Sequence, residues 1–279
     1  MSIVVNKQKY EVPGLETKSW VDNVSWIKYI TDKNPRSRQI RSIVAHTHEG
    51  ILSDLVQGMG KKSKIQENLV KYQTNTDRNV SWDYTIDMDG EVICQNDPLI
   101  DYSWQGNNLN PISLGFELVQ DKNEQDSKRR VLYSGQIEKT VLLIDFLTAT
   151  CGIQRQIPWN KKENKPNLKQ IARLSVSGGN GTDLVGIIGH VNITSQRGAG
   201  DPGPHLFYAL RDAGYELFDM DTAEDLKVWK ERQKQICGFQ DAECDGIPLK
   251  KTVEALKQKG YEHGIFVSRP IDALIKSET

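Results

Sequence analysis

Two of the five histidines in the chain stand directly after short apolar runs. His46 follows SIVA, and His190 follows LVGIIG. Asp201 lies further on, in a loop rich in glycine and proline. A single histidine at a strand end is commonly structural, because its ring satisfies a nearby backbone group. Two imidazoles with one carboxylate, however, are the protein donors of a catalytic zinc site that leaves the fourth position to water. The three residues together therefore match the donor set of a metal site that makes hydroxide available at neutral pH.

Apolar runs and their boundaries predict the elements that position these residues. The chain is expected to form an α/β fold in which helices flank a mixed central sheet. Asp89-Gly90 is a strong hairpin signal between two alternating segments. Strands are expected at residues 41–46, on either side of the Asp89-Gly90 turn, at 112–120 and at 184–190, with helices at 136–151 and 205–214. The segment between 152 and 183, which contains Pro158 and Pro166, is expected to be loop.

Glu117 is the only charged residue in the apolar run ISLGFELVQ. An ionised carboxylate inside so apolar a strand is unfavourable unless it faces a cleft or a partner. A partly desolvated glutamate of this kind can act as a general acid or base. The alternative is a solvated glutamate facing outward from an edge of the sheet.

Composition narrows the class of protein. Lys and Arg number 36 and Asp and Glu 37, a formal net charge of -1, so no strong basic field marks a nucleic-acid binder. The 26% of charged residues leave no apolar run that predicts a membrane span. The first residues lack the pattern of a secretory signal, so synthesis in the cytoplasm without a Sec signal is expected. Cys237 and Cys244 are expected either to bridge in an oxidising compartment or to remain free thiols.

The pattern of apolar and polar residues changes after the acidic stretch FDMDTAED. We expect a catalytic domain over residues 1–218, with its core at about 35–215, and a small helical domain over 222–279. Two short helical patterns, at 225–236 and 250–260, flank a loop with glycine and aspartate.

The motifs VAHTHEG, VSWDYTIDMDGEV, SLGFELVQ, GHVNIT and GDPGPH resemble, in order and rough spacing, those of the type 2 zinc N-acetylmuramoyl-L-alanine amidases, a family that includes the peptidoglycan recognition proteins. The resemblance covers roughly residues 35 to 215. It implies one Zn²⁺ per chain, held by His46, His190 and Asp201, with Glu117 as the catalytic acid. The implied reaction is hydrolysis of the amide bond between N-acetylmuramic acid and L-alanine of the stem peptide.

The chain departs from the family pattern at three motifs. Relatives often carry lysine at the position of Ala199, and we expect Arg197 to stabilise the oxyanion in its place, although an arginine cannot donate a proton as lysine does. In YSWQGN, Gln105 stands where relatives often have histidine, a position that is not a metal ligand. In VSWDY, Asp83 is expected to support an imidazole or to be an ordinary outward residue.

Three further residues are assigned to substrate contacts. Trp82 of the VSWDY motif is expected to line the glycan or peptide cleft. Trp104 of YSWQGN is assigned to the same surface. His48 lies two residues beyond His46, so in an extended segment it points to the same side and lines the pocket.

The C-terminal segment resembles a short peptidoglycan-binding domain, with landmarks in WKERQKQICGF, CDGIPLKKTVEAL and GYEHGIFVSRP. A lytic enzyme with a wall-binding domain and no signal is expected to be an endolysin released through a holin, or an antibacterial effector injected by a type VI-like system. Either would act on peptidoglycan in the periplasm or wall, and an effector would have a cognate immunity protein. The alternatives are a non-catalytic peptidoglycan recognition protein and a cytoplasmic muropeptide-recycling amidase.

Overall fold

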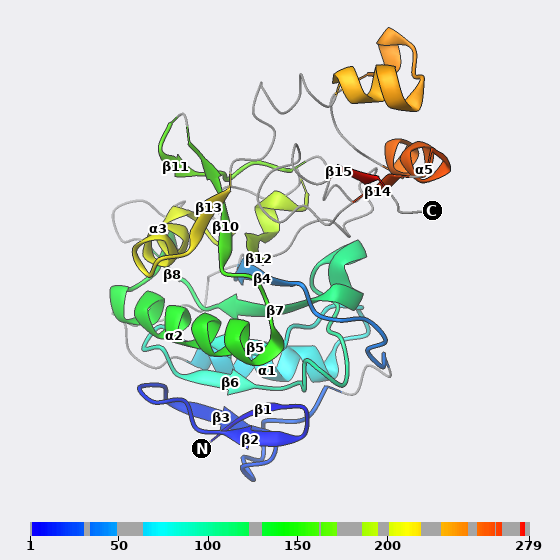
Figure 1. Cartoon of the computed structure of the whole chain (residues 1–279). Helices are drawn as coiled ribbons and strands as arrows, with labels where there is room; N and C mark the ends of the chain where they lie inside the picture. The colour runs from blue at the N-terminus through cyan, green and yellow to red at the C-terminus, as the bar shows by residue number, and fades with distance from the viewer. Residues whose placement is uncertain are drawn as a thin grey trace.

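A six-stranded mixed sheet forms the centre of the computed structural model (Figure 1). Its strands are, in spatial order, β12 (Gly186–Gly189), β4 (Ser42–Thr47), β7 (Ser113–Leu118), β5 (Tyr84–Ile86), β6 (Val92–Cys94) and β3 (Thr17–Ser19). The first four run parallel, β6 is antiparallel to β5, and β3 is parallel to β6. The structure describes residues 2–30, 34–48, 64–122, 130–161, 163–171, 186–194, 201–218, 230–244, 250–259, 261–263 and 274–276.

Helices cover both faces of this sheet, as expected for an α/β fold. The helices α2 (Ser134–Cys151) and α3 (Pro204–Asp212) pack on one face. The helix α1 (Lys64–Asn75) and the short helix η2 (Asn107–Ile112) lie on the other face. Figure 1 shows α2 and α3 on one side of the strands and α1 behind them. The predicted mixed sheet flanked by helices is confirmed.

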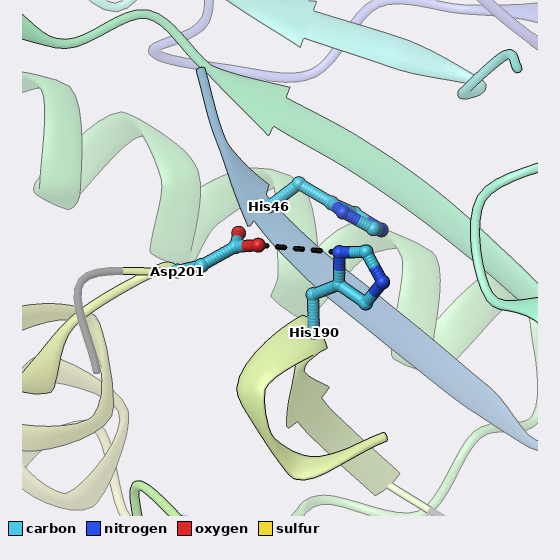
Figure 2. Close-up of side chains that lie close together, drawn as sticks. All are labelled: His46, His190 and Asp201. Carbon is cyan, nitrogen blue, oxygen red and sulfur yellow. Dashed lines mark ion pairs between the residues drawn. The ribbon is translucent and has the colours of Figure 1, made fainter. Parts of the chain in front are cut away.

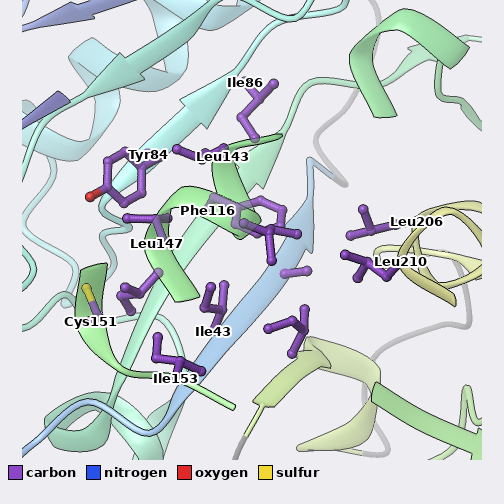
Figure 3. Packing of buried hydrophobic residues seen from close by; sticks show 14 of the residues in the cluster. Ile43, Tyr84, Ile86, Phe116, Leu143, Leu147, Cys151, Ile153, Leu206 and Leu210 are labelled. Carbon is purple, nitrogen blue, oxygen red and sulfur yellow. The ribbon is translucent and has the colours of Figure 1, made fainter. Parts of the chain in front are cut away.

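The alternation of side chains along the strands separates the face that carries the main core from the opposite face. Ile43 and Ala45 of β4 and Phe116 of β7 are fully buried on the core face. Figure 3 shows these strands packed against the apolar stripe of α2 and the first turns of α3. Residues on the opposite face, His46 and Glu117 among them, are therefore directed away from the main core.

Turns end these elements where the sequence predicts. Gly90, between β5 and β6, has φ +87, and Gly152 closes α2 with φ 68, both in the left-handed region that favours glycine. The predicted hairpin is confirmed by the antiparallel pairing of β5 and β6.

Smaller elements surround the central sheet. An N-terminal hairpin joins β1 (Ile3–Val5) and β2 (Gln8–Tyr10), and a second sheet has the order β11 (Lys165–Pro166), β10 (Gln156–Asn160), β13 (Glu216–Phe218). Two short strands, β8 (Asp121–Lys122) and β9 (Arg130–Val131), pair with each other, and η4 (His190–Asn192) follows β12. The segment expected to be loop around Pro158 is thus a strand, and the Pro158 carbonyl accepts a hydrogen bond from the Asn167 N–H at 3.2 Å.

The C-terminal part contains a π-helical turn η5 (Gln233–Cys237), η6 (Asp241–Glu243), α5 (Lys250–Gln258), β14 (Tyr261–His263) and β15 (Leu274–Lys276). The buried Gln233 donates to Thr252 Oγ1 at 3.1 Å, which joins η5 to α5. Cys237 and Cys244 are free thiols here, and burial raises the pKa of Cys237. The boundary between two domains near residues 219–229 lies outside the described residues and stays a prediction. Within the described part of the chain, no helix has the length and apolar character to cross a membrane.

Asp83 is a fully buried carboxylate that ties the strands together. It accepts hydrogen bonds from Asn96 Nδ2 at 2.7 Å, Ser103 Oγ at 2.9 Å and the Gly115 N–H at 2.8 Å. Burial raises the pKa of Asp83, and the nearby charge of Arg36 opposes that rise. Asp83 is therefore a structural residue, and both expectations for it, an imidazole partner and an outward polar residue, are wrong.

Replacing Asp83 with alanine should lower the free energy of unfolding by about 3 kcal/mol or more, since it leaves three donors without their acceptor and removes the negative charge that offsets the charge of Arg36. Urea unfolding followed by circular dichroism measures the loss. Asp77→Ala, at an exposed position, should change stability by less than about 0.5 kcal/mol. Equal stability of the two variants would contradict the structural role.

Candidate metal centre

Adjacent parallel strands place His46 and Glu117 side by side. The register of β4 and β7 pairs His46 directly with Glu117, so their side chains leave the sheet on the same face. Both are almost fully buried, with exposed fractions of 7% and 8%. A carboxylate thus lies next to a predicted metal ligand, as a proton-transferring group must.

His190 and Asp201 come together at the end of β12. His190 is the first residue of η4, and the Val191 N–H donates to the Asp201 carbonyl at 3.1 Å. Gly189 allows this approach, because a Cβ there would lie 2.7 Å from Pro202 Cδ. Steric contact with Pro202 therefore explains why a glycine directly precedes His190 at the end of the strand.

The three donors converge as the sequence predicts. One ligand atom from each of His46, His190 and Asp201 lies within 4.8 Å of the others. His190 Nδ1 is 3.2 Å from Asp201 Oδ2, and Figure 2 shows the His46 ring beside them. The Thr47 N–H donates to Asp201 Oδ1 at 2.8 Å and orients the carboxylate. Residues from three separate segments are thus brought to one buried point.

The electrostatics of the cluster favour an ionised Asp201. Burial alone raises the pKa of this carboxyl, but the hydrogen bond with His190, the charges of both imidazoles and the Thr47 N–H outweigh burial. Its pKa consequently lies below the ordinary value. A metal ligand must be deprotonated, so this environment prepares Asp201 for binding a cation.

The spacing of one donor pair also fits the geometry of zinc. In a tetrahedral site with bonds of about 2.0–2.1 Å, two donor atoms lie about 3.3 Å apart. The distance of 3.2 Å between His190 Nδ1 and Asp201 Oδ2 matches this separation. Both of these atoms are buried. These are the properties of two ligand atoms that share a metal ion.

Two of the three residues assigned to substrate contacts are half-buried. His48 follows β4 directly, is half-buried, and donates its N–H to the Leu118 carbonyl at 3.0 Å. Trp104 is half-buried, and its ring lies 5.8 Å from that of Tyr102 in an edge-on arrangement. His48 and Trp104 therefore retain surface that a substrate can contact.

Trp82 has a different environment. Its exposed fraction is 6%, and it packs against Leu69, Met88 and Val119. Its indole N–H donates to Thr85 Oγ1 at 2.7 Å. A side chain this buried has little surface for a ligand, so we treat Trp82 as a core residue and do not assign it to substrate. Arg197, the residue expected to stabilise the oxyanion, lies outside the described residues.

Gln105 is a neighbour of the centre that the sequence did not identify as one. Its Oε1 lies 3.1 Å from His46 Nε2. The two residues are 59 positions apart in the sequence, and no periodicity or motif connects them.

The sequence matches no protein-family model and no curated protein. Solved structures with some likeness include the Staphylococcus aureus hydrolase AmiA in complex with its ligand, at 16% identity over 74% of this chain and 79% of that chain, with a TM-score of 0.37. The N-acetylmuramyl-L-alanine amidase AmiD from E. coli, solved with an anhydro-muropeptide substrate, has 17% identity over 72% and 65% of the two chains and a TM-score of 0.37. Drosophila peptidoglycan recognition protein SD has 16% identity over 74% and 99%, with a TM-score of 0.39. With TM-scores below 0.5, these likenesses carry no argument about this chain.

Proposed function

We propose that this protein is a zinc-dependent N-acetylmuramoyl-L-alanine amidase. The observation that carries the proposal is the buried convergence of His46, His190 and Asp201, with Glu117 in register beside His46. The donor set and its spacing support a zinc hydrolase, and the resemblance of the sequence motifs to type 2 amidases supports the substrate. The scissile bond is the amide that joins the lactyl group of N-acetylmuramic acid to L-alanine.

His46, His190 and Asp201 would hold one zinc ion. When bound, zinc supplies Lewis acidity, which polarises a carbonyl oxygen and lowers the pKa of water so that it can lose a proton at neutral pH. Glu117 takes the proton of the attacking water and delivers it to the amide nitrogen as the bond to carbon breaks. The products are a muramic acid carboxylate and a free α-amino group on L-alanine, so water is the only co-reactant.

The remaining groups bind and orient the substrate. His48 and Trp104 are proposed to contact the muropeptide, because both are half-buried and adjoin in sequence Thr47 and Gln105, which contact Asp201 and His46. Arg197 is proposed, from its place in the sequence alone, to stabilise the negative charge on the carbonyl oxygen. The segment 222–279 is proposed to bind the wall polymer.

We also propose a biological role as a wall-lytic endolysin or an injected antibacterial effector. The neighbouring open reading frames distinguish the two roles, because an effector requires an immunity protein encoded beside it, whereas an endolysin accompanies a holin.

Zinc should bind the purified protein at about one ion per chain and stabilise it. At free zinc one hundred times the Kd, the free energy of unfolding should rise by about 2.7 kcal/mol. Chelation should abolish solubilisation of a peptidoglycan suspension, and zinc add-back should restore it. Activity unaffected by exhaustive chelation would contradict the proposed function.

A further inference from the structure

Gln105 joins His46 to the start of β7 through a continuous chain of hydrogen bonds. Its Oε1 lies 3.1 Å from His46 Nε2, and its Nε2 donates to Ser113 Oγ at 2.7 Å. Ser113 Oγ in turn donates to the Leu109 carbonyl at 2.9 Å. Gln105 and Ser113 are both buried, so water does not compete strongly for these groups.

The donors and acceptors along this series of hydrogen bonds can be assigned. The single hydroxyl proton of Ser113 is given to the Leu109 carbonyl, so Ser113 Oγ is an acceptor toward Gln105. The NH₂ group of Gln105 must then face Ser113, and its carbonyl oxygen must face His46. An acceptor beside His46 Nε2 requires the proton of the neutral ring to be on Nε2. The lone pair of that ring is then on Nδ1.

The backbone and a glycine hold Gln105 in this orientation. Asn110 Oδ1 accepts hydrogen bonds from the Gln105 N–H at 3.0 Å and the Gly106 N–H at 2.6 Å. The side-chain amide lies directly over Gly115 of β7, where an added Cβ would be 2.6 Å from both Cδ and Oε1 of Gln105. Gly115 therefore leaves the space through which Gln105 reaches His46.

We propose that Gln105 is a positioning residue that holds neutral His46 as its Nε2–H tautomer and so presents Nδ1 to the metal. The role in metal binding rests on the proposed function, whereas the tautomer is a property of the metal-free protein. A metal-binding histidine usually donates its other N–H to a fixed acceptor, and loss of that acceptor typically weakens metal binding by about 10–100-fold.

Nitrogen-15 NMR of the imidazoles in the metal-free full-length protein, at a pH where His46 is neutral, reads the tautomer directly. We expect the Nε2–H form in the wild type and a mixture of both tautomers in Gln105→Leu. Gln105→Glu retains an acceptor and should retain the Nε2–H form. Gly115→Ala should reproduce the mixture while Gln105 is still present, because the new methyl group displaces its amide.

Zinc titration calorimetry provides the second measurement. Gln105→Leu and Gly115→Ala should bind zinc about 10–100-fold more weakly than the wild type, and Gln105→Glu should restore most of the affinity. Gln66→Leu is the matched control, because Gln66 is a buried glutamine that donates to the Thr85 and Glu91 carbonyls. It should lower stability without changing the His46 tautomer.

The Nδ1–H tautomer in the wild type, or tautomer populations unchanged in Gln105→Leu, would overturn the inference. A wild type that shows the Nε2–H form but binds no zinc would overturn the proposed function instead, and would still support the assignment of the tautomer. The two failures are therefore distinguishable.

Discussion

Glu117→Ala should lower the rate of amide hydrolysis by about 10²–10⁴-fold, the contribution of a positioned general acid or base. Glu117 lies in register beside His46 and is 8% exposed, so no other carboxylate of the described strand can take its place. Zinc affinity should change little, because Glu117 is not one of the three converging donors. Release of new α-amino groups from purified peptidoglycan measures the rate, and calorimetry measures zinc binding.

Glu138→Ala is the matched control for this experiment. Glu138 is an exposed residue of α2, so its replacement should leave both rate and zinc affinity unchanged. Full activity of Glu117→Ala with zinc bound would show that the proton is moved by another group. Loss of zinc together with activity would instead make Glu117 part of the metal-binding set.

His190→Ala should remove both bound zinc and activity. His190 supplies one of three donors, and its Nδ1 lies 3.2 Å from Asp201 Oδ2, so its loss leaves only two protein ligands. Metal polarisation contributes several kcal/mol to hydrolysis, and about 1.4 kcal/mol corresponds to a factor of ten in rate. The rate should therefore fall by about 10³-fold or more, and zinc content measured after dialysis should fall well below one ion per chain.

His205→Ala separates this effect from the general removal of an imidazole. His205 is exposed on α3 and should be replaceable without loss of zinc or activity. If His190→Ala kept its zinc and its rate, the metal site would have to be built from other residues.

The strands and helices that the sequence predicted are those with a strong local pattern. β4 and β7 are short buried runs, the hairpin has Asp89-Gly90 at its turn, and α2 has apolar residues at helical spacing. These elements deliver His46 and Glu117, so the centre of the site was predictable as well. Asp201 was predictable because its loop, GDPGPH, resembles a family motif.

Elements whose stability depends on distant partners were not predicted. The sequence of α1 is polar and showed no helical pattern. In the fold, its buried Gln66 donates hydrogen bonds to the carbonyls of Thr85 and Glu91. The strand β10 contains Pro158, and its pairing with β13 joins segments far apart in the sequence. Local patterns carry no information about such contacts.

The same limitation applies to individual residues. Trp82 was assigned to a substrate cleft, and in the fold it is buried in a cluster with Leu69 of α1. Asp83 was expected near an imidazole or at the surface, yet Asn96, Ser103 and Gly115 surround it. The burial of a polar or aromatic residue is decided by what packs over it, and its own identity does not reveal that.

The most direct test of the central claim is the chemistry of the bond that the protein cleaves. Purified peptidoglycan is digested with zinc-loaded protein in water enriched in oxygen-18, and the products are identified by mass spectrometry. We predict free stem peptides that begin with L-alanine, and glycan strands whose muramic acid carboxylates carry one heavy oxygen. Cleavage at a glycosidic bond or within the peptide, or binding to the polymer without any release, would contradict the assignment of this protein as an amidase.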